Sequence, residues 1–87
     1  MILIVEDEPV SRRALRSLLS ASGYDAQAVG SAEEALRLIT DGQVPEVALI
    51  DLNLPGMNGM DLISYLEQAY PDVRAVLITA ASPETLQ

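Results

Sequence analysis

The sequence predicts an α/β fold, a doubly wound parallel sheet with helices on both faces. Two observations support this prediction. Four short segments, three of them mainly apolar, have the composition of strands, and helical segments of about 10–15 residues separate them. This alternation is typical of right-handed βαβ units, whose strands are parallel. If the second strand lies on one side of the first and the third on the other, the strand order is 2-1-3-4.

The strands are expected at Ile2–Val5, Ala26–Val29, Val47–Ile50 and Ala75–Thr79. The first of these is a continuous apolar run, which is the pattern of a strand that is buried on both faces. In an open parallel sheet, ligands bind outside the carboxyl ends of the strands, at the point where the strand order reverses. That point lies here between the first and third strands.

Start and stop signals place the helices between the strands. Pro9 suits the first turn of a helix, and Gly23 is a natural stop for the same helix. The Ser31–Glu34 segment is a capping box for a second helix, which ends at Asp41 and Gly42. The third helix is expected to begin at Asn58 and to end before Pro71, and Ser82-Pro-Glu would begin another.

Composition excludes several classes of protein. The net charge is −8 with only five arginines, which argues against a nucleic-acid surface and against direct nucleic-acid contact by this domain. The absence of cysteine and histidine excludes thiolate or imidazole metal ligands and a histidine base. Apolar runs are too short to span a membrane, and no signal peptide is visible. A soluble, cytoplasmic protein is the expectation.

Three carboxylates are predicted to meet at the carboxyl edge of the sheet. Glu6 and Asp7 directly follow the first strand, and Asp51 follows the third. A cluster of this kind requires a cation or partial protonation, and oxygen ligands without histidine or cysteine suit Mg²⁺. A Mg²⁺ ion with open positions attracts a phosphoryl group, which makes Asp51 a candidate nucleophile. Thr79 ends the neighbouring strand, and its hydroxyl is a candidate donor to that group.

Simpler interpretations exist for each of these residues. The acidic run from Glu6 to Glu8 is also typical of a solvated loop that favours the positive N-terminus of the next helix. Asp51 alone fits a turn, and Thr79 alone fits an ordinary β-branched strand position. Acids follow both the first and the third strand, which flank the point where the strand order reverses. This joint placement favours a cation-binding site over these alternatives.

Three segments resemble the receiver domains of two-component response regulators. They are Ile-Val-Glu-Asp-Glu at 4–8, Leu-Ile-Asp-Leu-Asn-Leu-Pro-Gly-Met-Asn-Gly at 49–59 and Val-Leu-Ile-Thr-Ala at 76–80. The resemblance covers residues 1–87 and implies a flavodoxin-like fold, whose strand order is 2-1-3-4-5. It also implies a phosphoprotein of two-component phosphorelay signalling, not an enzyme in the ordinary sense, although such a domain assists its own phosphorylation and dephosphorylation.

The resemblance also implies roles for single residues. Asp51 would accept a phosphoryl group from a sensor histidine kinase or a phosphotransfer protein, and its phosphorylation state would control an output domain. Asp7 would bind Mg²⁺ directly, Glu6 through water and Asn53 through its backbone carbonyl, together with Asp51. Thr79 would be the switch hydroxyl, and the small Ala80 would leave room for the donor's phosphohistidine.

The sequence departs from the family pattern at its C-terminal end. Receivers have a fifth strand with a lysine and a last helix, whereas this sequence contains no lysine and stops at Gln87. We therefore expect 1–87 to be a receiver that is incomplete at its C-terminus, with the fifth strand and last helix absent. The exposed edge of the fourth strand, and an apolar helix stripe without a partner (Leu15, Leu18 and Leu19), would then favour self-association.

Two other functions share part of this pattern. A Mg²⁺-dependent phosphohydrolase with an aspartate nucleophile commonly carries a second acid two residues later, and Asn53 occupies that position. A pseudo-receiver, which binds without phosphate turnover, would be indicated by a missing acid, yet Glu6, Asp7 and Asp51 are all present.

Overall fold

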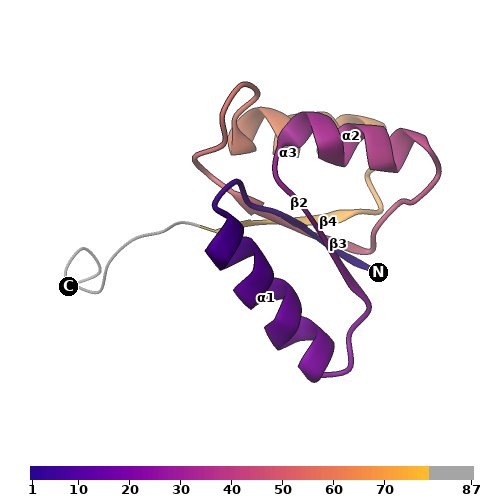
Figure 1. Cartoon of the computed structure of the whole chain (residues 1–87). Coiled ribbons are helices and arrows are strands. Elements are labelled where there is room, and N and C mark those ends of the chain that lie inside the picture. The colour runs from indigo at the N-terminus through magenta and orange to yellow at the C-terminus, as the bar shows by residue number, and fades with distance from the viewer. Residues whose placement is uncertain (79–87) are drawn as a thin grey trace, which may run out of the picture.

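The computed structural model describes residues 1–78 as a parallel sheet between two helical layers (Figure 1). The strands are β1 (Ile2–Val5), β2 (Ala26–Val29), β3 (Val47–Asp51) and β4 (Arg74–Ile78). They lie in the order β2-β1-β3-β4, and all neighbouring pairs are parallel. The helices are α1 (Pro9–Ala21), α2 (Ala32–Thr40) and α3 (Gly59–Ala69). The predicted fold class and strand order are confirmed.

Two strand boundaries differ from the prediction by one residue. The third strand continues through Asp51, because Asp51 pairs with Ile78 of the neighbouring strand. The fourth strand begins at Arg74 and not at Ala75, because the Arg74 N–H donates to the Glu46 carbonyl (2.9 Å) and so extends the ladder. Thr79, the predicted last residue of that strand, lies outside the described residues.

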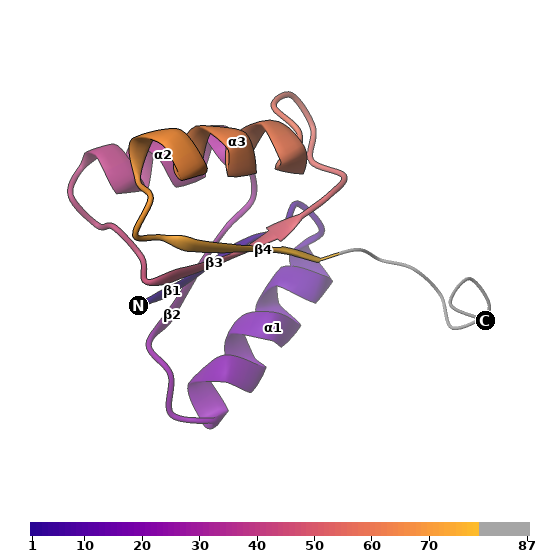
Figure 2. The same cartoon turned by 180° about the vertical axis from the view of Figure 1, so that it is seen from behind.

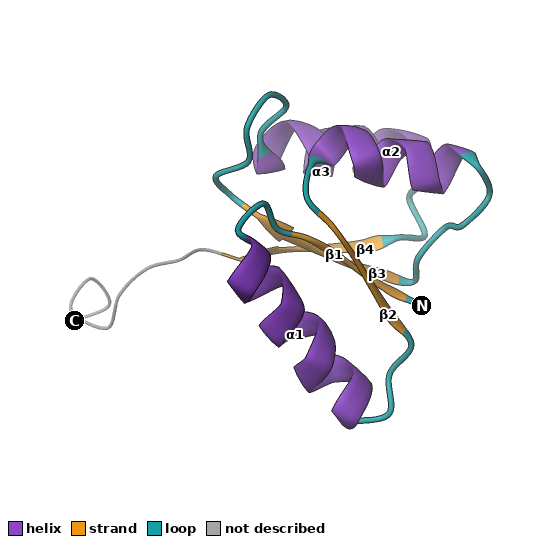
Figure 3. Cartoon of the chain, viewed as in Figure 1, coloured by secondary structure: helices purple, strands orange, loops and turns teal. Residues whose placement is uncertain are grey.

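The helices cover the two faces of the sheet unequally. Helices α2 and α3 lie together on one face and α1 lies alone on the other (Figures 1, 2 and 3). Alternate residues of each strand point to opposite faces, and the larger core lies on the face that α2 and α3 cover. That core consists mainly of Leu3, Val5, Ala32, Ala35, Ile39, Ala48, Ile50, Leu54, Leu62, Leu66 and Val73.

Local signals fix the helix ends. The Ser31 side chain accepts the N–H of Glu34 (3.1 Å), and the Asn58 side chain accepts the N–H of Asp61 (2.9 Å), as the sequence predicted. Gly23 follows α1 with φ +92°, a backbone conformation that favours glycine. These signals mark the starts of α2 and α3 and the end of α1.

The face covered by α1 is the more open one. The side chain of Leu18 is 64% exposed and that of Val76 is 40% exposed, and no residue of α1 is fully buried. A groove of about 370 Å³ on this face is lined by residues of α1, by Ile78 and by the acids Glu6 and Asp51. Within residues 1–78, no helix is both long enough and apolar enough to cross a membrane.

Candidate functional site

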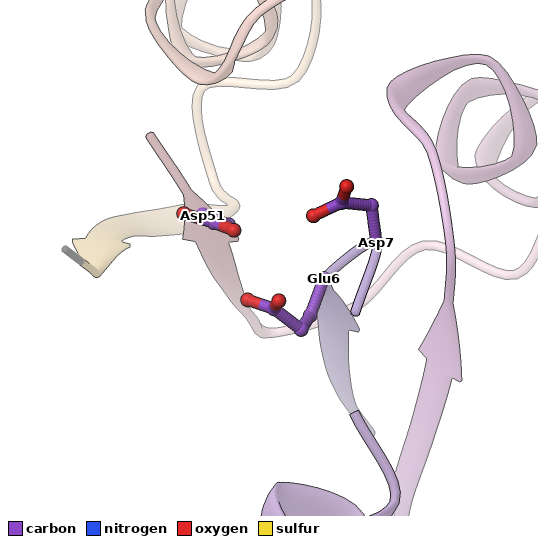
Figure 4. Close-up of side chains that lie close together, drawn as sticks. All are labelled: Glu6, Asp7 and Asp51. Carbon is purple, nitrogen blue, oxygen red and sulfur yellow. The ribbon is translucent and has the colours of Figure 1, made fainter. Parts of the chain in front are cut away.

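The three predicted acids meet at the carboxyl edge of the sheet. Strands β1 and β3 are neighbours in register, with Val5 opposite Ile50, so that both strands deliver acids to the same place. Glu6 and Asp7 follow β1, and Asp51 is the last residue of β3. The carboxylates of Glu6 and Asp7 turn toward Asp51 (Figure 4), and one carboxylate oxygen from each residue lies within 4.8 Å of the others.

Burial makes this cluster electrostatically costly. Glu6 is 9% exposed and Asp51 is 8% exposed, whereas Asp7 is open to solvent. Burial raises the pKa of the Glu6 carboxyl, and the nearby carboxylates of Asp51 and Asp7 raise it further. The N–H of Glu8 donates to Glu6 Oε1 (3.1 Å) and partly opposes this rise.

The cluster fits a hard divalent cation. Among the described residues, no arginine forms an ion pair with these three acids, and the ion pair that is found joins the N-terminal amine to Glu46 at 3.1 Å. Three carboxylates offer oxygen ligands only, which is the donor set that suits Mg²⁺. A dication between them would relieve the repulsion that raises the Glu6 pKa.

The loop after Asp51 is anchored at several points. The Asn53 N–H donates to Asp51 Oδ1 (3.2 Å), which orients the carboxylate. The Gly59 N–H donates to the Leu52 carbonyl (3.3 Å), and the backbone of buried Gly59 packs against that of Asp51. Leu54 is buried in the core. The loop therefore returns to the strand end that carries Asp51.

Three side chains support the site through contacts that the sequence did not specify, although the preference of the Glu6–Glu8 run for the helix N-terminus was anticipated and Glu8 bears it out. Glu8 caps α1 by accepting the N–H groups of Val10 (3.2 Å) and Ser11 (2.8 Å). Glu33 Oε2 accepts the Met57 N–H (3.3 Å), and Arg12 Nη1 donates to backbone carbonyls of the loop after β1. The position of Glu8 before a proline at the helix start was a usable signal, because that is the cap position.

Two predicted residues cannot be placed in this site. Thr79, predicted to supply the switch hydroxyl, and Ala80, predicted to leave room for the donor, both lie outside the described residues. The structure therefore brings together Glu6, Asp7 and Asp51, with the Asn53 backbone beside them.

Comparison with known proteins assigns the chain to a family. Residues 2–87 match the family model for the response regulator receiver domain. The transcriptional regulatory protein AruR of Pseudomonas aeruginosa is 36% identical over 87 residues, which cover 95% of this chain and 35% of AruR. The sensor protein TorS of Escherichia coli is 35% identical over 72 residues, which cover 83% of this chain and 8% of TorS.

A solved structure agrees with the sequence relatives. The response regulator TrrA of Thermotoga maritima, in complex with Mg²⁺ and BeF, superimposes with a TM-score of 0.86 at 31% identity. The match covers 93% of this chain and 70% of the TrrA chain. The chain thus spans about a third of AruR and most of the TrrA chain. It belongs to the response regulator receiver domain family.

Proposed function

We propose that Asp51 is the phosphoacceptor of this receiver and takes its phosphoryl group from a phosphohistidine of a sensor kinase or a phosphotransfer protein. The observation that carries the proposal is the nearly buried Asp51 carboxylate at the end of β3, grouped with Glu6 and Asp7. An Asp51 oxygen would attack phosphorus while the P–N bond of the donor breaks, and the electron pair of that bond returns to the imidazole.

Mg²⁺ is the proposed cofactor. Asp7 and Asp51 would bind it directly, Glu6 through water and Asn53 through its backbone carbonyl. The ion, when bound, would neutralise charge on the transferring oxygens. The carboxylate cluster supports this proposal because its own repulsion disfavours the ion-free state.

The remaining roles follow from the same proposal. Thr79 is proposed as the switch hydroxyl, and the domain is proposed to assist its own phosphorylation and dephosphorylation. Residues 1–87 are proposed as part of a receiver that is coupled to an output domain in a longer regulator, in line with the 35% of AruR that the match covers. Family membership favours neither a phosphohydrolase nor a pseudo-receiver.

Self-association through the edge of β4 remains a prediction. Among residues 1–78, β4 pairs with β3 alone, and Val76 of β4 is 40% exposed. Apolar strand edges of this kind favour pairing with another chain. Sedimentation analysis over a range of concentrations should show reversible association, and a single monomeric species at all concentrations would contradict it.

The metal site is tested by titrating the 87-residue protein with Mg²⁺ and following its backbone amide resonances. The largest shifts should fall at residues 6–8 and 51–53, with residues 79–80 also affected. The Asp51→Asn variant should bind Mg²⁺ more weakly because it lacks one carboxylate. Largest shifts near Glu33 and Glu34, which are exposed acids on α2, would refute the site.

A further inference from the structure

The side chain of Arg12 forms hydrogen bonds with the backbone of Glu6 and of Asp7, the two residues after β1 that are proposed to hold Mg²⁺. Arg12 Nη1 donates to the carbonyl oxygen of Glu6 (3.1 Å) and to that of Asp7 (3.3 Å). One planar donor group that reaches two successive carbonyls restricts the rotation of the backbone between them. The direction in which the Glu6 and Asp7 side chains leave the loop is therefore restrained by Arg12.

The position of Arg12 in its helix is unfavourable for the helix itself. Arg12 is the fourth residue of α1, which begins at Pro9. A cation near a helix N-terminus opposes the helix dipole, which favours negative groups there. Two interactions offset this. The N–H groups of Ser11 and Val10 lower the pKa of the Glu8 cap, and the nearby charge of Arg12 lowers it further. The Arg12 guanidinium also donates two hydrogen bonds to the preceding loop.

The end of β2 leaves space for the guanidinium group. A Cβ atom added to Gly30, which directly follows β2, would lie 3.0 Å from Arg12 Nη1. The Gly30 N–H is itself held by Glu34 Oε2 (3.3 Å), so that Gly30 is tied to the start of α2. Even the smallest side chain at Gly30 would therefore press on Arg12.

We propose that Arg12 is a positioning residue for the metal site, which fixes the loop after β1 so that Glu6 and Asp7 face Asp51. This inference rests on the proposed Mg²⁺ function. Figure 4 shows the arrangement that Arg12 is proposed to maintain, with the carboxylates of Glu6 and Asp7 turned toward Asp51. The matched reference is Arg13, which has the same charge, is exposed, and has no hydrogen bond to this loop among the described residues.

Charge and positioning have opposite effects on Mg²⁺ affinity. Removal of a cation close to an acidic site favours the binding of a dication, because one repulsion is lost. Loss of a partner that orients metal ligands typically weakens binding about 10- to 100-fold. A weaker Mg²⁺ affinity after neutralisation of Arg12 therefore cannot be a simple charge effect.

The test compares Mg²⁺ affinities, measured from amide shifts, in wild type, Arg12→Gln, Arg13→Gln and Gly30→Ala. We expect Arg12→Gln to lose affinity by roughly tenfold, whereas Arg13→Gln should bind equally well or slightly more tightly. Gly30→Ala keeps every charge and should show a smaller loss in the same direction. It also serves as the test if Arg12→Gln does not fold.

A second readout needs no metal. In the Mg²⁺-free protein, Arg12→Gln should shift the amide resonances of Asp7 and Glu8, and Arg13→Gln should leave them in place. Equal Mg²⁺ affinities in Arg12→Gln and Arg13→Gln, or unchanged metal-free spectra, would overturn the positioning role. If wild type itself binds no Mg²⁺ at residues 6–8 and 51–53, the proposed function fails, and the metal-free comparison then decides whether Arg12 orders the loop.

Discussion

Substitution of Gly59 by alanine should separate the start of α3 from the strand that carries Asp51. Gly59 is buried, and a Cβ atom built there would overlap the carbonyl oxygen of Asp51. The same atom would lie 3.1 Å from the Asp51 carbonyl carbon and 3.1 Å from the Leu52 Cα. All three contacts are with backbone, so that no side-chain rotation relieves them and either the helix or the strand end must move.

The expected loss follows from two opposing effects. Overpacking of a well-packed site costs about 1–3 kcal/mol, and backbone contacts place Gly59→Ala at the upper end. Alanine in a helix gains up to about 1 kcal/mol over glycine. The net loss of about 2 kcal/mol should lower the melting temperature of a domain of this size by roughly 8–16 °C.

Thermal melting and amide spectra of Gly59→Ala test this reasoning together. The resonances of Asp51 and Leu52 should shift, and Mg²⁺ binding should weaken. Gly42→Ala is the matched control, because Gly42 lies at the opposite edge of the sheet with φ +97° and nothing within 4 Å. It should lose about 1–2 kcal/mol through backbone strain alone and bind Mg²⁺ normally. A Gly59→Ala protein as stable as wild type would refute the steric argument.

Two further predictions concern single carboxylates. Burial and nearby carboxylates raise the pKa of Glu6 in the folded protein above its ordinary value of 4.5. The favourable contribution of Glu6 to folding stability is therefore fully present below pH 4.5 and is lost as the pH rises through the folded-state pKa. In the absence of Mg²⁺, the free energy of unfolding measured by urea denaturation should therefore be larger for Glu6→Gln than for wild type at pH 7.5, but not at pH 4. A Glu6→Gln protein that is less stable than wild type at pH 7.5 would contradict this. Glu33→Ala should cost about 0.5–1.5 kcal/mol and speed hydrogen exchange at the Met57 amide, which Glu33 holds. Glu33→Gln, which keeps an acceptor oxygen, should restore most of the protection, and unchanged exchange in Glu33→Ala would exclude this anchor.

The sequence was sufficient for the features that depend on local pattern. The bounds of β1 and β2 were predicted correctly, and β1 is the clearer case because its continuous apolar residues mark a buried strand. The caps at Ser31 and Asn58 were predicted from residue type and spacing. The meeting of Glu6, Asp7 and Asp51 followed from parallel topology, since the carboxyl ends of adjacent parallel strands share one edge.

The sequence was not sufficient for contacts that depend on side-chain direction and on the path of loops. Glu33 and Met57 are 24 residues apart, and nothing local to either residue indicates their hydrogen bond. The hydrogen bonds from Arg12 to the carbonyls of Glu6 and Asp7 depend on how the loop between β1 and α1 bends, and the spacing of apolar residues does not predict that bend. Arg74 belongs to β4 because its backbone pairs with Val47 and its N–H donates to the Glu46 carbonyl, although a charged side chain is unfavourable in a strand pattern.

The most direct test of the central claim is to map the phosphorylated residue. The protein is incubated with acetyl phosphate and Mg²⁺, trapped with borohydride, digested and analysed by mass spectrometry, alongside its Asp51→Asn variant. Labelling of the 87 residues should be slow, because the sequence supplies no lysine to pair with the phosphoryl oxygens. We predict that the label lies on Asp51 alone, depends on Mg²⁺ and is absent from Asp51→Asn. A label on another carboxylate, or one retained by Asp51→Asn, would contradict the account.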